Sequence, residues 1–133
     1  MAKSIAFVNQ KGGVGKTTSC VNLASCLRAA GARVLVCDFD PQGNATSGLG
    51  VDKVAAFPTV YEAIIGSTPA ANAVVNTPYG DILPANKALA GATVEMINLE
   101  KREFLLRDAL APLGEDYDFI LIDCPPSLEM LTL

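Results

Sequence analysis

The feature of this chain that most constrains its fold is a glycine-rich stretch, Gln10–Gly15, set between an apolar segment and a segment with helical periodicity. The apolar run Ser4–Val8 predicts a short buried strand, and the spacing of apolar residues predicts a helix over Thr17–Ala30. Gly31 suits the position after that helix, and Arg33–Cys37 predicts a second, uniformly apolar strand. This strand–helix–strand order predicts a right-handed βαβ unit in a parallel sheet with helices on both faces.

Further along, the chain alternates between loop, helix and strand signals. Phe119–Ile122 predicts a third buried strand, closed by Asp123. Weaker signals predict a loop over Asp40–Gly50, a short helix over Thr59–Ile65, a strand over Asp81–Leu83 or from Tyr79, ending at Pro84, and two helical stretches within Lys87–Leu113 with a break near Glu100. We therefore expect an α/β fold with a mostly parallel sheet.

Composition excludes several kinds of chemistry. The chain has 133 residues, half of them hydrophobic, which is enough for one domain with a buried core. It has no histidine, which excludes an imidazole base and a His-ligated zinc site. The four cysteines form no C-x-x-C pair and are interpreted as small apolar residues in a reduced compartment. The net charge of −4 argues against a uniformly basic nucleic-acid-binding surface.

Two further expectations concern the ends and the location of the chain. No apolar run is long enough to span a bilayer or form a signal-peptide core, so we expect a soluble, cytoplasmic protein. After Ser127 a new helical pattern begins and stops at Leu133 without a capping signal. We therefore expect residues 1–133 to be the N-terminal part of a single, longer domain.

The glycine-rich stretch predicts a phosphate-binding loop. Its glycines let backbone N–H groups turn toward phosphate oxygens, and the following helix adds its positive end. Lys16 is expected to reach the phosphates and Thr17 to offer its hydroxyl to Mg²⁺. The usual G-x-x-x-x-G-K-[ST] pattern is not fully met, because Gln10 stands where its first glycine would be and Lys11 follows.

Acidic residues follow two of the predicted strands. Ligands of such sheets bind at the carboxyl ends of the strands, where Asp38, Asp40 and Asp123 are expected. Asp40 is a candidate to orient or deprotonate a water, Asp38 to support a metal or the loop, and Asp123 to hold Mg²⁺. The turn Cys124–Ser127, with Pro125 and Pro126, is a candidate switch that senses the nucleotide.

Four segments together resemble the deviant Walker A ATPases, and most closely the ParA/Soj chromosome and plasmid partitioning family. They are KGGVGKTT (11–18), DFDPQGNATSGLG (38–50), LPANKALAGA (83–92) and FILIDCPPS (119–127). The first segment is shared with MinD-like proteins, nitrogenase iron proteins and amidoligase-type enzymes. The second and fourth favour ParA/Soj.

The resemblance implies an ATPase with a three-layer P-loop NTPase fold, of which this chain is the N-terminal half. It implies ATP and Mg²⁺ as ligands and a homodimer that forms on ATP, with Lys11 reaching the partner's nucleotide. By the resemblance, Lys16 and Asp40 join Lys11 in catalysis, and Thr17 and Asp123 serve the metal. Asp38 joins this metal set because of its expected place at a strand end, not because of the resemblance. The nucleotide-binding set is Lys11, Gly12, Gly13, Val14, Gly15, Lys16, Thr17 and Thr18.

The resemblance also implies partners. Family members bind DNA without sequence preference and work with a ParB-type protein, which suggests a nucleoid-associated protein that does not bind membranes. The family's DNA-binding and adenine-binding regions are expected beyond Leu133. The alternatives are a MinD-like membrane-associated ATPase, an iron–sulfur protein like the nitrogenase iron protein, and a nucleotide-binding fragment without activity.

Overall fold

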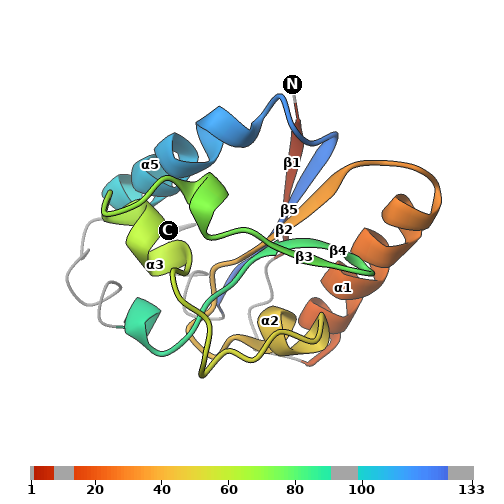
Figure 1. Ribbon diagram of the computed structural model, residues 1–133, viewed down its shortest axis with the longest axis horizontal. Helices are drawn as coiled ribbons and strands as arrows, with labels where there is room; N and C mark the ends of the chain where they lie inside the picture. The colour runs from red at the N-terminus through yellow and green to blue at the C-terminus, as the bar shows by residue number, and fades with distance from the viewer. Residues whose placement is uncertain (1, 8–13, 91–98, 126–133) are drawn as a thin grey trace.

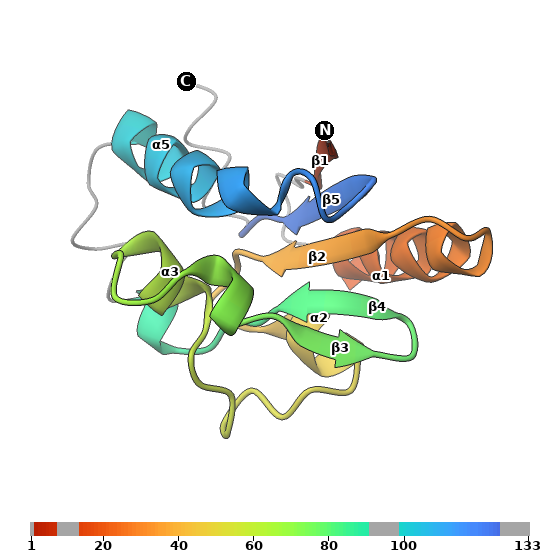
Figure 2. The same cartoon turned by 45° about the horizontal axis from the view of Figure 1, so that its top comes forward.

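The computed structural model describes residues 2–7, 14–90 and 99–125, and its centre is a five-stranded sheet. The strand order is β1-β5-β2-β4-β3, and all neighbours are parallel except the antiparallel pair β3–β4 (Figure 2). The strands are β1 (Lys3–Phe7), β2 (Val34–Asp38), β3 (Val75–Thr77), β4 (Gly80–Leu83) and β5 (Phe119–Asp123).

Helices cover both faces of this sheet, so the architecture has three layers (Figures 1 and 2). Helices α1 (Val14–Ala29) and α2 (Asn44–Gly48) lie on one face, and α3 (Val60–Ile64) and α5 (Leu99–Leu110) lie on the other. Two 3₁₀ turns, η1 (Ala70–Asn72) and η2 (Ala111–Leu113), complete the elements. This arrangement confirms the expected α/β fold with a mostly parallel sheet.

Strand β2 is the shared wall of two hydrophobic cores, and all five of its residues are buried. Val34 and Val36 pack with Cys20 and Ala24 of α1 on one side of the sheet. The alternate residues of β2 face the other core, together with residues of α3 and α5: Leu35, Cys37, Val60, Ile64, Leu106 and Leu110. Because side chains alternate along a strand, the uniformly apolar run is what a strand covered on both faces requires.

Several predicted boundaries differ from the structure. Helix α1 begins at Val14, three residues before the predicted start, and the segment 40–50 is not all loop, because α2 forms within it. The hairpin partner β3 was not predicted. The predicted break near Glu100 falls next to the start of α5 at Leu99, and residues 91–98, which precede α5, lie outside the described residues.

The parallel register brings three strand ends together. Asp123 is paired with Phe7 of β1 on one side and with Asp38 of β2 on the other. Beyond the ladder, the Phe39 N–H donates to the Asp123 carbonyl and the Cys124 N–H to the Phe7 carbonyl. The acids that close β2 and β5 therefore lie at one edge of the sheet, next to the start of α1.

Across residues 2–7, 14–90 and 99–125, none of the helices combines the length and the apolar character that crossing a bilayer demands.

Candidate nucleotide-binding site

The first turn of α1 carries Lys16 into a buried ionic cluster. Its Nζ lies 2.6 Å from Oδ1 of Asp123, and it also donates to the backbone carbonyl of Cys124. A carboxylate oxygen of Asp40 is 3.9 Å from the same Nζ. One ammonium group therefore links the ends of β2 and β5 to the start of α1, in a place where the side chains of Lys16 and Asp123 are 4% and 0% exposed.

Thr17, the next residue of α1, makes a hydrogen bond to the second carboxylate oxygen of Asp123. Its hydroxyl donates to Oδ2 at 3.0 Å, so the carboxylate of Asp123 is shared between two consecutive helix residues. A threonine hydroxyl and a carboxylate are hard oxygen ligands of the kind that Mg²⁺ accepts. No group of three or more acidic, cysteine or histidine side chains that could hold a metal by itself exists among the described residues. Magnesium bound with a nucleotide needs only one or two protein ligands, since phosphates and waters supply the rest.

The described part of the amino end of α1 is suited to an anion. Its first turn contains no acidic residue that would neutralise the positive end of the helix dipole. At Gly15 an added Cβ would meet no described atom within 4 Å, so protein packing in the described residues does not explain the glycine. A residue without a side chain at this place leaves room for a ligand to approach the backbone, which fits a phosphate group.

Asp40 is held by its own loop. Its carboxylate accepts a hydrogen bond from the Gln42 N–H, and its carbonyl accepts one from the Gly43 N–H. Gly43 adopts a left-handed conformation with φ of 67°, and a Cβ there would lie 2.8 Å from Cδ of Lys53 and 2.9 Å from the Ala85 carbonyl oxygen. This position therefore requires glycine both for its backbone angle and for its packing.

Asp38 is completely buried, and hydrogen bonds from the loop fill both of its oxygens. Oδ1 accepts from the Asp40 N–H, and Oδ2 accepts from the N–H and the hydroxyl of Thr46. Desolvation raises the pKa of Asp38 to about 6, against the lowering effect of these bonds. Of the two roles that the sequence left open for Asp38, this geometry favours support of the loop over metal binding.

Part of the predicted site falls outside the described residues. Lys11, Gly12 and Gly13 lie there, as do Pro126 and Ser127 of the predicted switch, and the side chain of Val14 is not described. Within the described part, the structure brings Lys16, Thr17, Asp40 and Asp123 together. Thr18, at the same helix end, is exposed.

Sequence reasoning missed one member of this neighbourhood, Thr46. Its hydroxyl donates to Asp38 and accepts from the Ala85 N–H at 3.0 Å. The signal that was available is the threonine at the eighth position after Asp38, inside a loop of small residues where a buried hydroxyl needs a partner. Lys53, whose Nζ donates to the Gln42 carbonyl, was also not singled out.

Three of the four cysteines are buried, and Cys26 is exposed. Burial is the main cause that raises the pKa of Cys20 to about 12, and it raises the pKa of Cys37 well above its usual value. These two thiols are therefore protonated at neutral pH, which agrees with their interpretation as small apolar residues.

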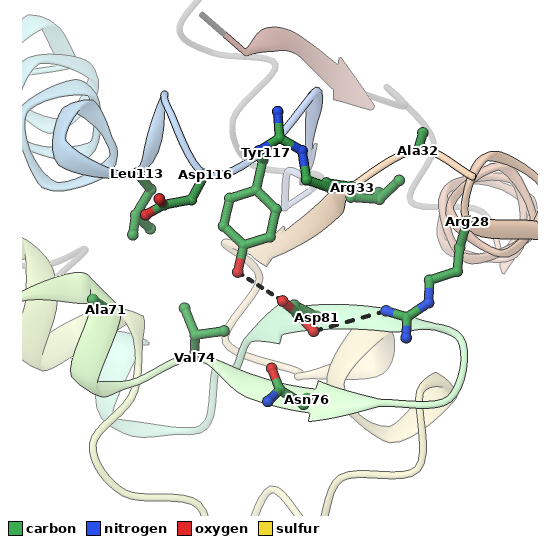
Figure 3. Close-up of a pocket in the computed structure, with 11 residues that line it drawn as sticks. Arg28, Ala32, Arg33, Ala71, Val74, Asn76, Asp81, Leu113, Asp116 and Tyr117 are labelled. Carbon is green, nitrogen blue, oxygen red and sulfur yellow. Dashed lines mark hydrogen bonds and ion pairs between the residues drawn. The ribbon is translucent and has the colours of Figure 1, made fainter. Parts of the chain in front are cut away.

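A separate cavity of about 610 Å³ opens at the amino ends of the strands (Figure 3). None of Lys16, Asp40 and Asp123 lines it. At its centre, the Tyr117 hydroxyl donates to Asp81 at 2.8 Å, and Arg28 lies 3.9 Å from the other oxygen of the same carboxylate. Its lining carries two arginines and two aspartates, Arg28, Arg33, Asp81 and Asp116, so the ionic charges balance. The lining contains neither a glycine nor a lysine, in contrast to the site at the start of α1.

Comparison with known proteins gives a consistent family assignment. The model of a family described as "AAA domain" matches residues 2–133. Chromosome partitioning protein ParA from Myxococcus xanthus is 50% identical over the whole chain, which covers 48% of that protein. Chromosome-partitioning ATPase Soj from Treponema pallidum is also 50% identical, with 52% of its length covered. The chain thus spans about half the length of the curated relatives it matches.

Solved structures share the fold. Cobyrinic acid a,c-diamide synthase from Mycobacterium smegmatis, with an ATP analogue and magnesium bound, superposes with a TM-score of 0.90 at 42% identity. The match covers 99% of this chain and 55% of that one. A plasmid partition protein from Borrelia burgdorferi has a TM-score of 0.79 at 27% identity, covering 96% of this chain and 58% of that one.

Proposed function

Because this chain belongs to the AAA domain family and, within it, resembles the ParA/Soj partitioning ATPases throughout its length, we propose that the protein binds and hydrolyses Mg-ATP in chromosome or plasmid partitioning. The observation that carries the proposal is the contact of Lys16 and Thr17 with Asp123 at the amino end of α1. This arrangement offers a cation, a hydroxyl and a carboxylate beside a helix end that favours phosphate.

Lys16 is the residue we assign to the phosphates of ATP. In the structure it neutralises Asp123 and lies close to Asp40, so a charge suited to the phosphates is already present before the nucleotide arrives. The backbone N–H groups in the first turn of α1 would bind phosphate oxygens, because a helix cannot satisfy its first four N–H groups internally. Lys11, Gly12 and Gly13 remain assigned to the same phosphates by the family resemblance alone.

Thr17 and Asp123 are the residues we assign to Mg²⁺. Their two oxygen atoms lie 3.0 Å apart, and both can serve as ligands, directly or through water. When bound, the metal neutralises charge that develops on the transferred phosphoryl group. With Mg²⁺ bound, Asp123 would no longer need Lys16 as its counter-ion. The Lys16 ammonium could then contact a phosphate.

Asp40 is the residue we assign to the attacking water. Its side chain is almost completely buried, lies near Lys16, and is held by the Gln42 N–H. A carboxylate held in this way can orient a water and accept its proton when the water attacks the γ-phosphate. The proton passes to Asp40, and the bond to the leaving ADP oxygen breaks as the new bond to phosphorus forms.

Partners and location follow from the family. We propose an ATP-dependent homodimer with Lys11 acting across the interface, non-specific DNA binding through regions beyond Leu133, and a ParB-type partner. On the same basis we propose that the protein is located on the nucleoid in the cytoplasm. The support for them is the similarity to chromosome partitioning proteins.

A nucleotide titration tests the proposed site. A fluorescent ATP analogue with Mg²⁺ is titrated into the 133-residue chain and into the full-length protein. The control is a Lys16→Ala variant whose fold is checked by circular dichroism. We expect saturable binding that Lys16→Ala loses, and phosphate release by the full-length protein that Asp40→Ala reduces to a small residual rate. Binding that is unchanged in Lys16→Ala would overturn the assignment of the site.

A second candidate function is ATP-dependent amide formation on a carboxylate, as in the cobyrinic acid a,c-diamide synthase. The observation that favours it is the TM-score of 0.90 at 42% identity over 99% of this chain. The two functions separate in one assay, because a partitioning ATPase releases phosphate from ATP without any carboxylate acceptor. Phosphate release that requires cobyrinic acid would favour the amide-forming reaction.

A further inference from the structure

Thr46 connects two segments that the sequence analysis singled out but to which the proposed function gives no shared role. One is the loop that begins at Asp38, and the other is the L-P-A-N segment that follows β4. Thr46 is the third residue of α2 and is completely buried. Its hydroxyl donates to Oδ2 of Asp38 at 2.7 Å and accepts from the Ala85 N–H at 3.0 Å. A single hydroxyl thus joins Asp38 to Ala85, which lies 39 residues beyond Thr46 in the chain.

The connection continues to the proposed water-activating acid. Oδ1 of Asp38, the oxygen that Thr46 does not occupy, accepts the Asp40 N–H at 3.1 Å. The line of hydrogen bonds therefore runs from the backbone of Ala85 through Thr46 and Asp38 to the backbone of Asp40. The Asp38 carboxylate is fixed at both oxygens, so it cannot rotate without breaking a bond to one of its neighbours.

We propose that Thr46 is a positioning residue for ATP hydrolysis, which sets the place of Asp40 through Asp38 while contacting neither nucleotide nor water itself. This inference rests on the proposed function, because it takes Asp40 as the acid that acts on water. A methyl group cannot replace the Thr46 hydroxyl, because it offers no hydrogen-bond donor or acceptor. Bulk water cannot replace it either, because both Asp38 and Ala85 are buried. Small displacements of a group that acts on the reacting atoms can reduce turnover about 100-fold.

Thr46→Val is the informative variant, because valine keeps the branched shape and removes only the hydroxyl. We expect kcat to fall roughly 10- to 100-fold, while the Kd for the fluorescent ATP analogue changes by less than about threefold, because Lys16 and Thr17 are untouched. Thr46→Ser keeps the hydroxyl and should restore kcat. The matched control is Ser47→Ala, the exposed neighbour on the same helix, which should behave as wild type.

A double-variant cycle separates positioning from general loss of stability. If Thr46 acts through Asp40, Thr46→Val should reduce single-turnover hydrolysis no further in an Asp40→Ala background. An additional loss in that background, or an equal loss in Thr46→Ser and Thr46→Val, would overturn the inference. If the valine variant does not fold, Thr46→Ala replaces it in the same cycle, with the same expectation.

A readout without catalysis keeps this inference separate from the proposed function. Amide hydrogen exchange at Asp40 reports its bond to Asp38, and we expect exchange to speed up at least tenfold in Thr46→Val but not in Thr46→Ser. Absence of ATP hydrolysis in the wild-type, full-length protein would overturn the proposed function. Unchanged kcat and unchanged Asp40 exchange in Thr46→Val would overturn the positioning role alone.

Discussion

The Nζ of Lys16 and the Oδ1 of Asp123 lie 2.6 Å apart, and both side chains are almost completely withdrawn from water. Each charge would be costly to bury alone, because desolvation of an isolated ion is not repaid in the protein interior. The pair also joins the first turn of α1 to the end of β5. This one contact should therefore matter both for nucleotide binding and for the stability of the fold.

Replacement of Lys16 by alanine should weaken both nucleotide binding and the fold. Asp123 would keep its bond from Thr17 but lose its counter-ion, and removal of one partner of a buried pair costs about 3 kcal/mol. Urea unfolding followed by circular dichroism measures this loss. The control is Lys87→Ala at an exposed lysine, which should leave stability within about 0.5 kcal/mol of wild type. Adding Asp123→Asn should recover much of the stability but none of the nucleotide binding.

Stability should depend on the ionisation of Asp38. Its pKa rises from 3.8 to about 6 on folding, so the folded protein favours the protonated form. The contribution of this group to stability is complete below pH 3.8 and is lost as the pH rises through 6, by up to about 3 kcal/mol. Other acids titrate in the same range, so the quantity to measure is the difference between wild type and Asp38→Asn in urea unfolding at several pH values. A difference that stays constant from pH 4 to 7 would contradict the raised pKa.

Two glycine substitutions separate backbone strain from steric overlap. Gly43 and Gly66 both have positive φ, 67° and 84°, but an added Cβ meets Lys53 and Ala85 only at Gly43. Gly66→Ala should therefore cost about 1 kcal/mol from strain alone. Gly43→Ala should cost about 1 to 3 kcal/mol more and should slow ATP hydrolysis, because the loop that holds Asp40 must move. Equal costs in thermal or urea unfolding would mean that the loop has room to relax.

The contact between Tyr117 and Asp81 should matter for stability and not for the nucleotide. Burial, with a further contribution from Asp81, raises the pKa of Tyr117, and its hydroxyl donates to that carboxylate at 2.8 Å. Tyr117→Phe removes one hydrogen bond and should cost about 1 kcal/mol. Affinity for the ATP analogue should not change, because this cavity lies at the amino ends of the strands. Tyr61→Phe, at a partly buried tyrosine packed against the core, is the control and should leave both quantities unchanged.

The sequence predicted the elements whose apolar pattern is continuous. Strands β2 and β5 are short apolar runs covered on both faces, so burial and sequence pattern coincide. The strand β3 was missed because it has three residues, of which only Thr77 is buried, and it pairs along one side with β4. Such an edge strand owes its conformation to its neighbour and leaves little signal in its own composition.

Helix α2 was missed for a different reason. Apart from Ala45, its residues (Asn44–Gly48) are poor helix formers, and its N-cap position, Gly43, makes no side-chain hydrogen bond. The helix is supported instead by tertiary contacts, since the buried Asp38 carboxylate accepts the Thr46 N–H. A contact between residues eight positions apart, through a side chain at the end of a strand, is not visible to helical periodicity.

The part of the candidate site that was predictable is the part whose residues have a characteristic spacing in the sequence. Spacing placed Lys16 and Thr17 at the start of a helix and Asp123 at the end of a strand, and the structure brings the three side chains into contact. Their roles toward ATP and Mg²⁺ remain predictions. The link from Thr46 to Ala85 could not be predicted, because it depends on how the segment after β4 lies beside α2, which no local pattern encodes.

The shared position of β2 also has a mechanical consequence. Val36 belongs to the core under α1, and Cys37, its neighbour, belongs to the core under α5. Neither core can loosen without disturbing the strand that the other packs against, so the two halves of the interior should open together as one cooperative unit. Asp38 and Asp123 close β2 and its neighbour β5. The acids of the candidate site are thus anchored in strands of the shared core, so the geometry at the sheet edge should persist until the whole interior opens.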